Sequence, residues 1–163
     1  MSAQSIVAQS QIWILLTQGF DDAQVSTILA ALQELGQTVN IISPRYGLVE
    51  GLYGLQIEPH LNLSDLPMLM PEQILIIPGA STCVQTLLAD PRTHRLLRAL
   101  LIKQGRILTM MGSIRPMLFN VGLLNPTNQH QLKQIVMDRD ASTKNFLQHY
   151  FELAEGIKRI SLA

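Results

Sequence analysis

The sequence has few of the residues that define several classes of protein. One cysteine among 163 residues excludes an intramolecular disulfide and a zinc site built from cysteines. Charged residues make up only 15% of the chain, and 12 basic residues balance 12 acidic ones, which predicts no nucleic-acid partner. No apolar run reaches the length of about 20 residues that a membrane span needs. The first residues also lack the pattern of a secretory signal, which favours a cytoplasmic protein.

Hydrophobic residues make up 47% of the chain, enough for one folded domain with a sizeable core. We expect residues 1–10, rich in Ser, Gln and Ala, to form a flexible lead-in, and residues 11–163 to form a single domain. Basic residues gather between positions 92 and 106, on and just after a predicted helix. This cluster indicates a solvated helix face, with an anion or RNA contact as the alternative.

Short apolar runs alternate with segments of helical periodicity, a pattern typical of a doubly wound α/β protein. Strands are predicted over residues 12–16, 38–42, 73–77 and 107–111, with a last edge strand over 134–137. Helices are predicted between positions 21 and 36, 81 and 88, 90 and 105, 113 and 119, and 142 and 157. Asp21, Ser81 or Thr82, and Asp90 are the expected caps. Glycines and prolines between 44 and 71 predict a small hairpin excursion.

Residues 105–124 have the layout of a nucleophile elbow, in which a buried strand, a sharp turn and a helix follow one another. An enzyme displays Cys or Ser at the strained turn, but this chain has Gly112 there. Glycine has no side chain to attack a substrate, and it occupies strained backbone regions without cost. The pattern therefore predicts an enzyme scaffold from which the nucleophile has been removed.

The order of these pieces, with the residues that separate them, resembles the PfpI/DJ-1 superfamily within the class I glutamine amidotransferase-like fold. The matching stretch runs from Ile12 to about Leu124. Its marks are Gly19-Phe20-Asp21-Asp22, Ile42-Ser43-Pro44, Ile77-Pro78-Gly79, Asp90-Pro91 and Gly122-Leu123-Leu124. The resemblance implies a flavodoxin-like three-layer sandwich with a mainly parallel sheet and a shortened C-terminal part.

The resemblance also implies where the family's chemistry should lie: a cysteine at the elbow, an acidic residue that hydrogen-bonds it, and often a histidine beside it. These positions fall on Gly112, Gln24 and Ser113. A glutamine can form hydrogen bonds but cannot transfer a proton. We therefore predict a vestigial site without catalytic residues. The expected role is that of a pseudoenzyme: a regulatory, ligand-sensing or protein-interaction subunit, as a homodimer or within a larger complex.

Two residues keep an enzymatic alternative open. Ser113 is the nearest candidate for a relocated nucleophile, although a serine at a helix start also serves as a cap. Cys83 lies in the first turn of a predicted helix, where the helix dipole can lower a thiol pKa and make it redox-reactive. A free cysteine is also a common small buried hydrophobe. A hydrolase, lyase or glyoxalase-type enzyme would use one of these two residues.

Ligand or partner contacts are predicted at the loop after the third strand and at the start of the elbow helix: Gly79, Ala80, Ile114 and Arg115. Arg115 could clamp a small anionic ligand, or it could pair with Asp21, Asp22 or a partner chain. His60 is predicted to be an exposed loop histidine. No histidines or carboxylates have the spacing of a metal-binding helix face, so we expect neither a metal nor a cofactor.

Overall fold

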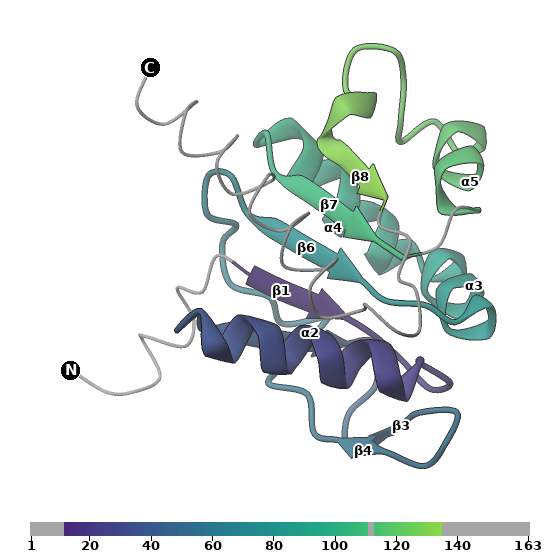
Figure 1. The fold of residues 1–163 in the computed structure, drawn as a ribbon. Helices are drawn as coiled ribbons and strands as arrows, with labels where there is room; N and C mark the ends of the chain where they lie inside the picture. The colour runs from purple at the N-terminus through teal and green to yellow at the C-terminus, as the bar shows by residue number, and fades with distance from the viewer. Residues whose placement is uncertain (1–11, 111–112, 135–163) are drawn as a thin grey trace.

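The computed structural model describes residues 12–110 and 113–134, and a six-stranded sheet forms its centre (Figure 1). The strands are β1 (Ile12–Leu15), β2 (Val39–Ser43), β5 (Leu61–Asn62), β6 (Ile74–Ile77), β7 (Arg106–Thr109) and β8 (Leu132–Gln134). They lie in the order β5-β2-β1-β6-β7-β8, and every neighbouring pair is parallel. Apart from β5, this is the order of flavodoxin-like doubly wound sheets. The predicted α/β class and mainly parallel sheet are confirmed.

Helices cover both faces of this sheet. α2 (Asp22–Glu34) lies in front of it in Figure 1 and α4 (Pro91–Ile102) lies behind it. α3 (Ser81–Ala89) and α5 (Ile114–Asn120) lie beyond the ends of β6 and β7. β1 and β6 are buried along their whole length, as expected for strands covered on both faces. Within residues 12–110 and 113–134, no helix is long and apolar enough to cross a membrane.

α2 begins and ends where the sequence predicts. The Asp21 carboxylate accepts a hydrogen bond from the Gln24 N–H over 3.0 Å and caps the first turn. Gly36, with φ +68°, closes α2 in a Schellman motif, and Gly122, with φ +79°, closes α5 in the same way. The predicted cap of α3 is wrong, because the carbonyl of Ala80 already accepts the first helical bond, and Ala80 is the N-cap.

The end of α4 also differs from the prediction, which gave the helix stop to Gly105. The left-handed residue is Gln104, with φ 59°, and the Gly105 N–H completes the Schellman motif by donating to Leu100. Gly105 is required for space instead. A Cβ atom there would lie 2.6 Å from the Leu100 side chain and 2.8 Å from the Gln73 carbonyl oxygen.

Replacing Gln104 with glycine is expected to stabilise the protein by about 0.5–1 kcal/mol, because glycine adopts positive φ without the steric cost of a side chain. Urea unfolding of the variant and the wild type would measure this change. The same substitution at exposed Gln37, which is outside the left-handed region, should destabilise instead. Destabilisation by both substitutions would contradict the prediction.

The predicted hairpin excursion between β2 and β6 is present. β3 (Val49–Glu50) pairs antiparallel with β4 (Gln56–Ile57). β5 could not be predicted, because two residues carry too little periodicity to indicate a strand. The last edge strand is also earlier than predicted, since the buried Gln131 amide donates to Leu101 and Gly105 and sets β8 beside β7 from Leu132 onward. Residues 135–137, the lead-in over 1–10 and the closing helix over 142–157 lie outside the described residues.

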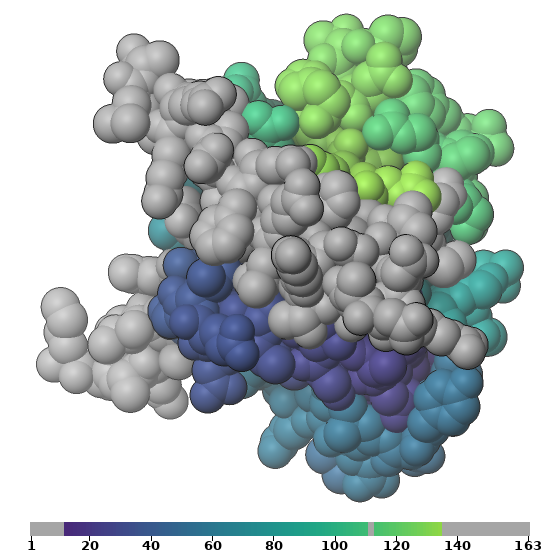
Figure 2. Space-filling view, in the orientation of Figure 1, coloured from purple at the N-terminus to yellow at the C-terminus, as the bar shows by residue number. Residues whose placement is uncertain are grey.

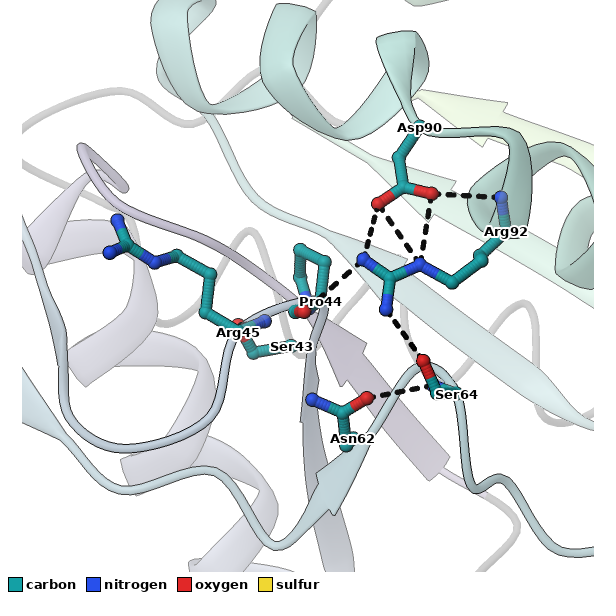
Figure 3. Close-up of polar contacts among 7 residues, drawn as sticks. All are labelled: Ser43, Pro44, Arg45, Asn62, Ser64, Asp90 and Arg92. Atoms are coloured by element: carbon teal, nitrogen blue, oxygen red, sulfur yellow. Dashed lines mark hydrogen bonds and ion pairs between the residues drawn. The ribbon is translucent and has the colours of Figure 1, made fainter.

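Asp90 and Arg92 join the start of α4 to the ends of β2 and β5 (Figure 3). The Asp90 carboxylate accepts from the Arg92 N–H over 2.9 Å and forms an ion pair with the guanidinium, with Nη2 and Oδ2 2.6 Å apart. The same guanidinium donates to the Ser64 hydroxyl over 2.7 Å and to the Pro44 carbonyl over 3.2 Å. One arginine therefore holds three segments of the chain together.

This ion pair predicts a loss of stability in acid. The Arg92 guanidinium lowers the pKa of the Asp90 carboxyl below its ordinary value of 3.8. A carboxylate with a lowered folded pKa stabilises the folded state above its unfolded pKa, and this contribution is lost as the pH falls through the folded pKa. We expect the free energy of unfolding to fall below about pH 4, and to fall less steeply in an Asp90→Asn variant. Glu34→Gln is the control, and equal slopes for Asp90→Asn and wild type would contradict the prediction.

Candidate functional site

The crevice at the carboxyl ends of β1 and β6 is the candidate site, because the strand order reverses there. From β1 the chain passes to β2 on one side, and β6 lies on the other side. In open α/β sheets, ligands bind outside the carboxyl ends of the strands at such a switch point. The loop over 16–21 follows β1, and the loop over 78–80 follows β6. The structure therefore brings the predicted site residues Gly79 and Ala80 beside the start of α2, which carries Gln24.

Gln24 and Gly79 meet across this crevice. Gln24 lies in the first turn of α2, and its Oε1 accepts a hydrogen bond from the Gly79 N–H over 2.8 Å. The Gly79 carbonyl in turn accepts from the Asp21 N–H over 2.8 Å. Both backbone groups of Gly79 are thus bonded to the start of α2, and Gly79 itself is buried. The amide oxygen of Gln24, the residue predicted to stand at the position of an acid, therefore already accepts a hydrogen bond.

The elbow itself is described only in part. Gly112 lies outside the described residues, whereas Ser113 is the exposed N-cap of α5. Its hydroxyl makes no capping hydrogen bond, because the residue has helical backbone angles, φ −71° and ψ −12°, where a capping residue is normally extended. The bonded cap that the sequence predicted for Ser113 is therefore missing.

Ile114 and Arg115 open α5. Ile114 is fully buried and packs in the core. The half-buried Arg115 donates from Nη2 to the Leu132 carbonyl over 3.1 Å, so it ties α5 to β8. It forms no ion pair with Asp21 or Asp22, as one alternative predicted, because these carboxylates accept backbone N–H groups instead.

Cys83 lies on α3 and faces the loop after β1. Its side chain is 0% exposed, and its Sγ lies 3.4 Å from both the N–H and the carbonyl oxygen of Thr17. Burial raises the pKa of the thiol, which is the opposite of the direction that a redox-reactive cysteine at a helix start requires. The thiol packs as a small core side chain between α3 and β1.

His60 is exposed but not free. Its Nδ1 accepts a hydrogen bond from the Ile41 N–H over 2.8 Å, so the ring joins the segment before β5 to β2. The sequence could not show this contact, because the two residues are 19 positions apart. In the part of the chain that the structure describes, no group of three His, Cys, Asp or Glu side chains could hold a metal ion.

The hairpin contributes to the crevice in a way that the sequence did not reveal. Asp22 accepts hydrogen bonds from the Tyr53 and Leu55 N–H groups over 3.1 and 2.8 Å, and these bonds lower the pKa of its carboxyl against the opposing effect of desolvation. Gly51 leaves the space for this carboxylate, which a Cβ atom at that position would meet. The three glycines of the excursion were the only available signal.

The chain belongs to the DJ-1/PfpI family, whose sequence model matches residues 10–141. This confirms the resemblance found in the sequence. No protein of curated function matches the chain.

Solved structures of the same superfamily share the fold. An oxidized DJ-1 from Toxoplasma gondii aligns with a TM-score of 0.68 at 14% identity, over 93% of this chain and 97% of that one. A cysteine-to-alanine mutant of a DJ-1 superfamily protein from Salmonella typhimurium aligns with a TM-score of 0.60 at 19% identity, over 71% of this chain and 63% of that one. A two-domain protein from Anabaena variabilis, with DJ-1/ThiJ/PfpI-like and ferritin-like domains, aligns with a TM-score of 0.53 at 17% identity. That match covers 60% of this chain and 28% of that one.

Proposed function

We propose that this chain is a non-catalytic member of the DJ-1/PfpI family that acts as a regulatory, ligand-sensing or protein-interaction subunit. The contact between Gln24 and Gly79 is the observation that carries this proposal. A carboxylic acid at position 24 could exchange a proton with a neighbouring thiol, but an amide cannot. Here the amide oxygen already accepts the Gly79 N–H over 2.8 Å, so it ties α2 to the loop after β6.

The alternative enzymes lack a prepared nucleophile. Nucleophilic catalysis requires a base within hydrogen-bonding reach or a lowered pKa. Cys83 is buried with a raised thiol pKa, and the Ser113 hydroxyl has no hydrogen bond to a histidine or a carboxylate of the described residues. Arg115 keeps free donors for a small anionic ligand, because within the described residues it donates only from Nη2, to the Leu132 carbonyl.

Covalent labelling and turnover assays test the loss of catalysis together. Iodoacetamide would probe Cys83, a fluorophosphonate would probe Ser113, and glyoxals, amides and isonitriles would be offered as substrates. We expect no labelling above that of the matched Cys83→Ala and Ser113→Ala variants, and no turnover. A Gly112→Cys variant provides the positive control for thiol labelling. Turnover that disappears in Cys83→Ala or Ser113→Ala would sink the proposal.

The hairpin supports the interaction part of the role. Five large hydrophobic side chains are exposed within ten consecutive residues: Tyr46, Leu48, Leu52, Tyr53 and Leu55. Tyr46 and Tyr53 are 75% and 84% exposed. The hairpin forms the lower end of the described surface in Figure 2. Exposed apolar clusters of this kind mark contacts with other chains, and tyrosines are frequent anchors in them.

Sedimentation velocity tests this part. We expect the whole chain to self-associate, and a Tyr53→Asp variant to shift toward the monomer. A Val121→Asp change places the same charge on another exposed hydrophobic residue, at the end of α5 and far from the hairpin in sequence, and serves as the control. If the chain is a monomer at all concentrations, the proposed homodimer is excluded, and only an interaction with a different protein is left.

A further inference from the structure

α4 carries a row of arginines toward solvent. Arg92, Arg95 and Arg98 recur at every third residue, so they lie along one side of the helix about 4.5 Å apart in rise. The helix contains no acidic residue. Arg92 is paired with Asp90, whereas Arg95 and Arg98 are exposed and form no ion pair within the described part of the chain. Arg98 therefore has no acidic partner among these residues, and Arg95 has only the longer-range attraction of Asp90.

Apolar grooves run along both sides of this row. One has a volume of about 540 Å³ and is lined by Leu88, Ala89, Pro91, His94, Arg95 and Arg98. The other has a volume of about 370 Å³, and Leu63, Leu66, Leu69 and Leu96 line it together with Arg92 and Arg95. Arg95 borders both grooves. The arginine row, with aliphatic side chains lining the groove on either side, therefore forms an amphipathic surface.

The end of the row is apolar as well. Ile102 follows Arg98 by four residues and is 75% exposed. Both side chains line a further groove of about 300 Å³ with Leu101 and Leu123. The surface thus extends along α4 and continues toward the segment after α5.

We propose that this face of α4 binds an acidic amphipathic helix of a partner protein. Carboxylates three or four residues apart on a helix match the spacing of Arg95 and Arg98, and each guanidinium can hold a carboxylate through two hydrogen bonds. Leucine or isoleucine side chains on the same helix would enter the grooves beside the arginines. Opposite charge attracts and orients such a helix, while the buried apolar contacts hold it.

Charge and lining favour a protein over a nucleic acid. The chain has a formal net charge of zero, and the only unpaired cations of the row are two neighbouring arginines. The grooves beside them are lined mainly by aliphatic side chains and arginines, and the one aromatic ring among the lining residues, His94, is hydrogen-bonded to the Leu88 carbonyl. This proposal names the partner for the interaction role above and rests on that role. Its surface is separate from the crevice, so a turnover assay and a binding assay can fail independently.

Fluorescence polarisation with a labelled, designed 18-residue helix tests the proposal. The probe carries glutamates at four-residue spacing beside a leucine stripe, and the protein is the whole chain. We expect saturable binding that weakens with added salt. Binding should weaken by about tenfold in Arg98→Glu, and further in Arg95→Glu with Arg98→Glu. Arg45→Glu is the matched control, because Arg45 is also exposed but belongs to the loop after β2.

Circular dichroism of each variant would establish that the fold is intact. Equal weakening by Arg45→Glu and Arg98→Glu would overturn the proposal, and so would the absence of binding by the wild type. Tighter binding to a single-stranded oligonucleotide or to vesicles of anionic lipid, lost in the same variants, would replace the helix with that other ligand. A probe with its glutamates changed to lysines should not bind.

Discussion

Replacing Trp13 with alanine is expected to lower the free energy of unfolding by about 3–5 kcal/mol, the usual cost of deleting a large buried aromatic side chain. Trp13 lies on the central strand β1, between Asn40 of β2 and Leu75 of β6, and is 1% exposed. The surrounding strands are parallel and covered on both faces, so the cavity has little freedom to collapse. Urea unfolding followed by circular dichroism would measure the change, because the variant loses the only tryptophan.

A Trp13→Phe variant separates packing from hydrogen bonding. The indole Nε1 is buried and has no hydrogen-bond partner among the residues that the structure describes. Removing this unpaired donor while keeping an aromatic ring should cost less than half as much as the alanine substitution, because no hydrogen bond is lost. Equal costs for the two variants would mean that the indole N–H contributes to stability.

Replacing Gly105 with alanine is expected to destabilise the protein by about 3 kcal/mol, at the upper end of the cost of overpacking a core. The added Cβ would lie 2.6 Å from the Leu100 side chain and 2.8 Å from the Gln73 carbonyl oxygen. Leu100 can move its side chain, but the Gln73 carbonyl is bonded to the Arg106 N–H and belongs to the entry of β6. Alanine therefore displaces backbone, and not only a flexible side chain.

A double-mutant cycle with Leu100→Ala tests this reason. Shortening Leu100 removes one of the two clashes. The loss of unfolding free energy in the double variant should therefore be smaller, by at least about 0.5 kcal/mol, than the sum of the losses in the two single variants. Wild-type stability of Gly105→Ala would contradict the predicted lack of space. The cycle would be measured by chemical unfolding at neutral pH.

The function proposed for the ends of β1 and β6 and the function proposed for α4 use different parts of the fold. Gln24 and Gly79 lie where β1 and β6 end, at the start of α2 and α3. Arg95 and Arg98 are exposed residues of α4, the helix that lies behind the sheet in Figure 1. One part could therefore bind a ligand while the other holds a partner, which is the arrangement a regulatory subunit requires.

The helix ends show why some boundaries could be predicted and others could not. Gly36 and Gly122 are glycines at positive φ, so residue type and conformation agree and the sequence reveals the stop. At the end of α4 the positive φ falls on Gln104, and the adjacent Gly105 misled the prediction by one residue. Glycine is needed at position 105 because there is no space for a side chain beside Gln73, a residue 32 positions earlier.

In the candidate site, too, some features could be predicted from the sequence and others could not. Gln24 was found by its position in a family pattern, and its chemistry follows from the residue type alone. Its bond to the Gly79 N–H could not be predicted, because the two residues are 55 positions apart and meet only through the order of β1 and β6. From the sequence, Cys83 could be a reactive thiol with a lowered pKa or a small buried side chain. Burial beside Thr17 raises the thiol pKa, which supports the second interpretation.

The sequence by itself determined the alternation of strands and helices, the α/β class and the family. These properties depend on local periodicity and residue type, which the sequence contains without any knowledge of the fold. Tertiary structure alone decided that Gln24 closes onto Gly79, that Arg115 binds Leu132 in place of Asp21 or Asp22, and that unpaired arginines border apolar grooves. Hydrogen bonds and desolvation act over a few ångströms, and only the folded chain brings such distant residues that close.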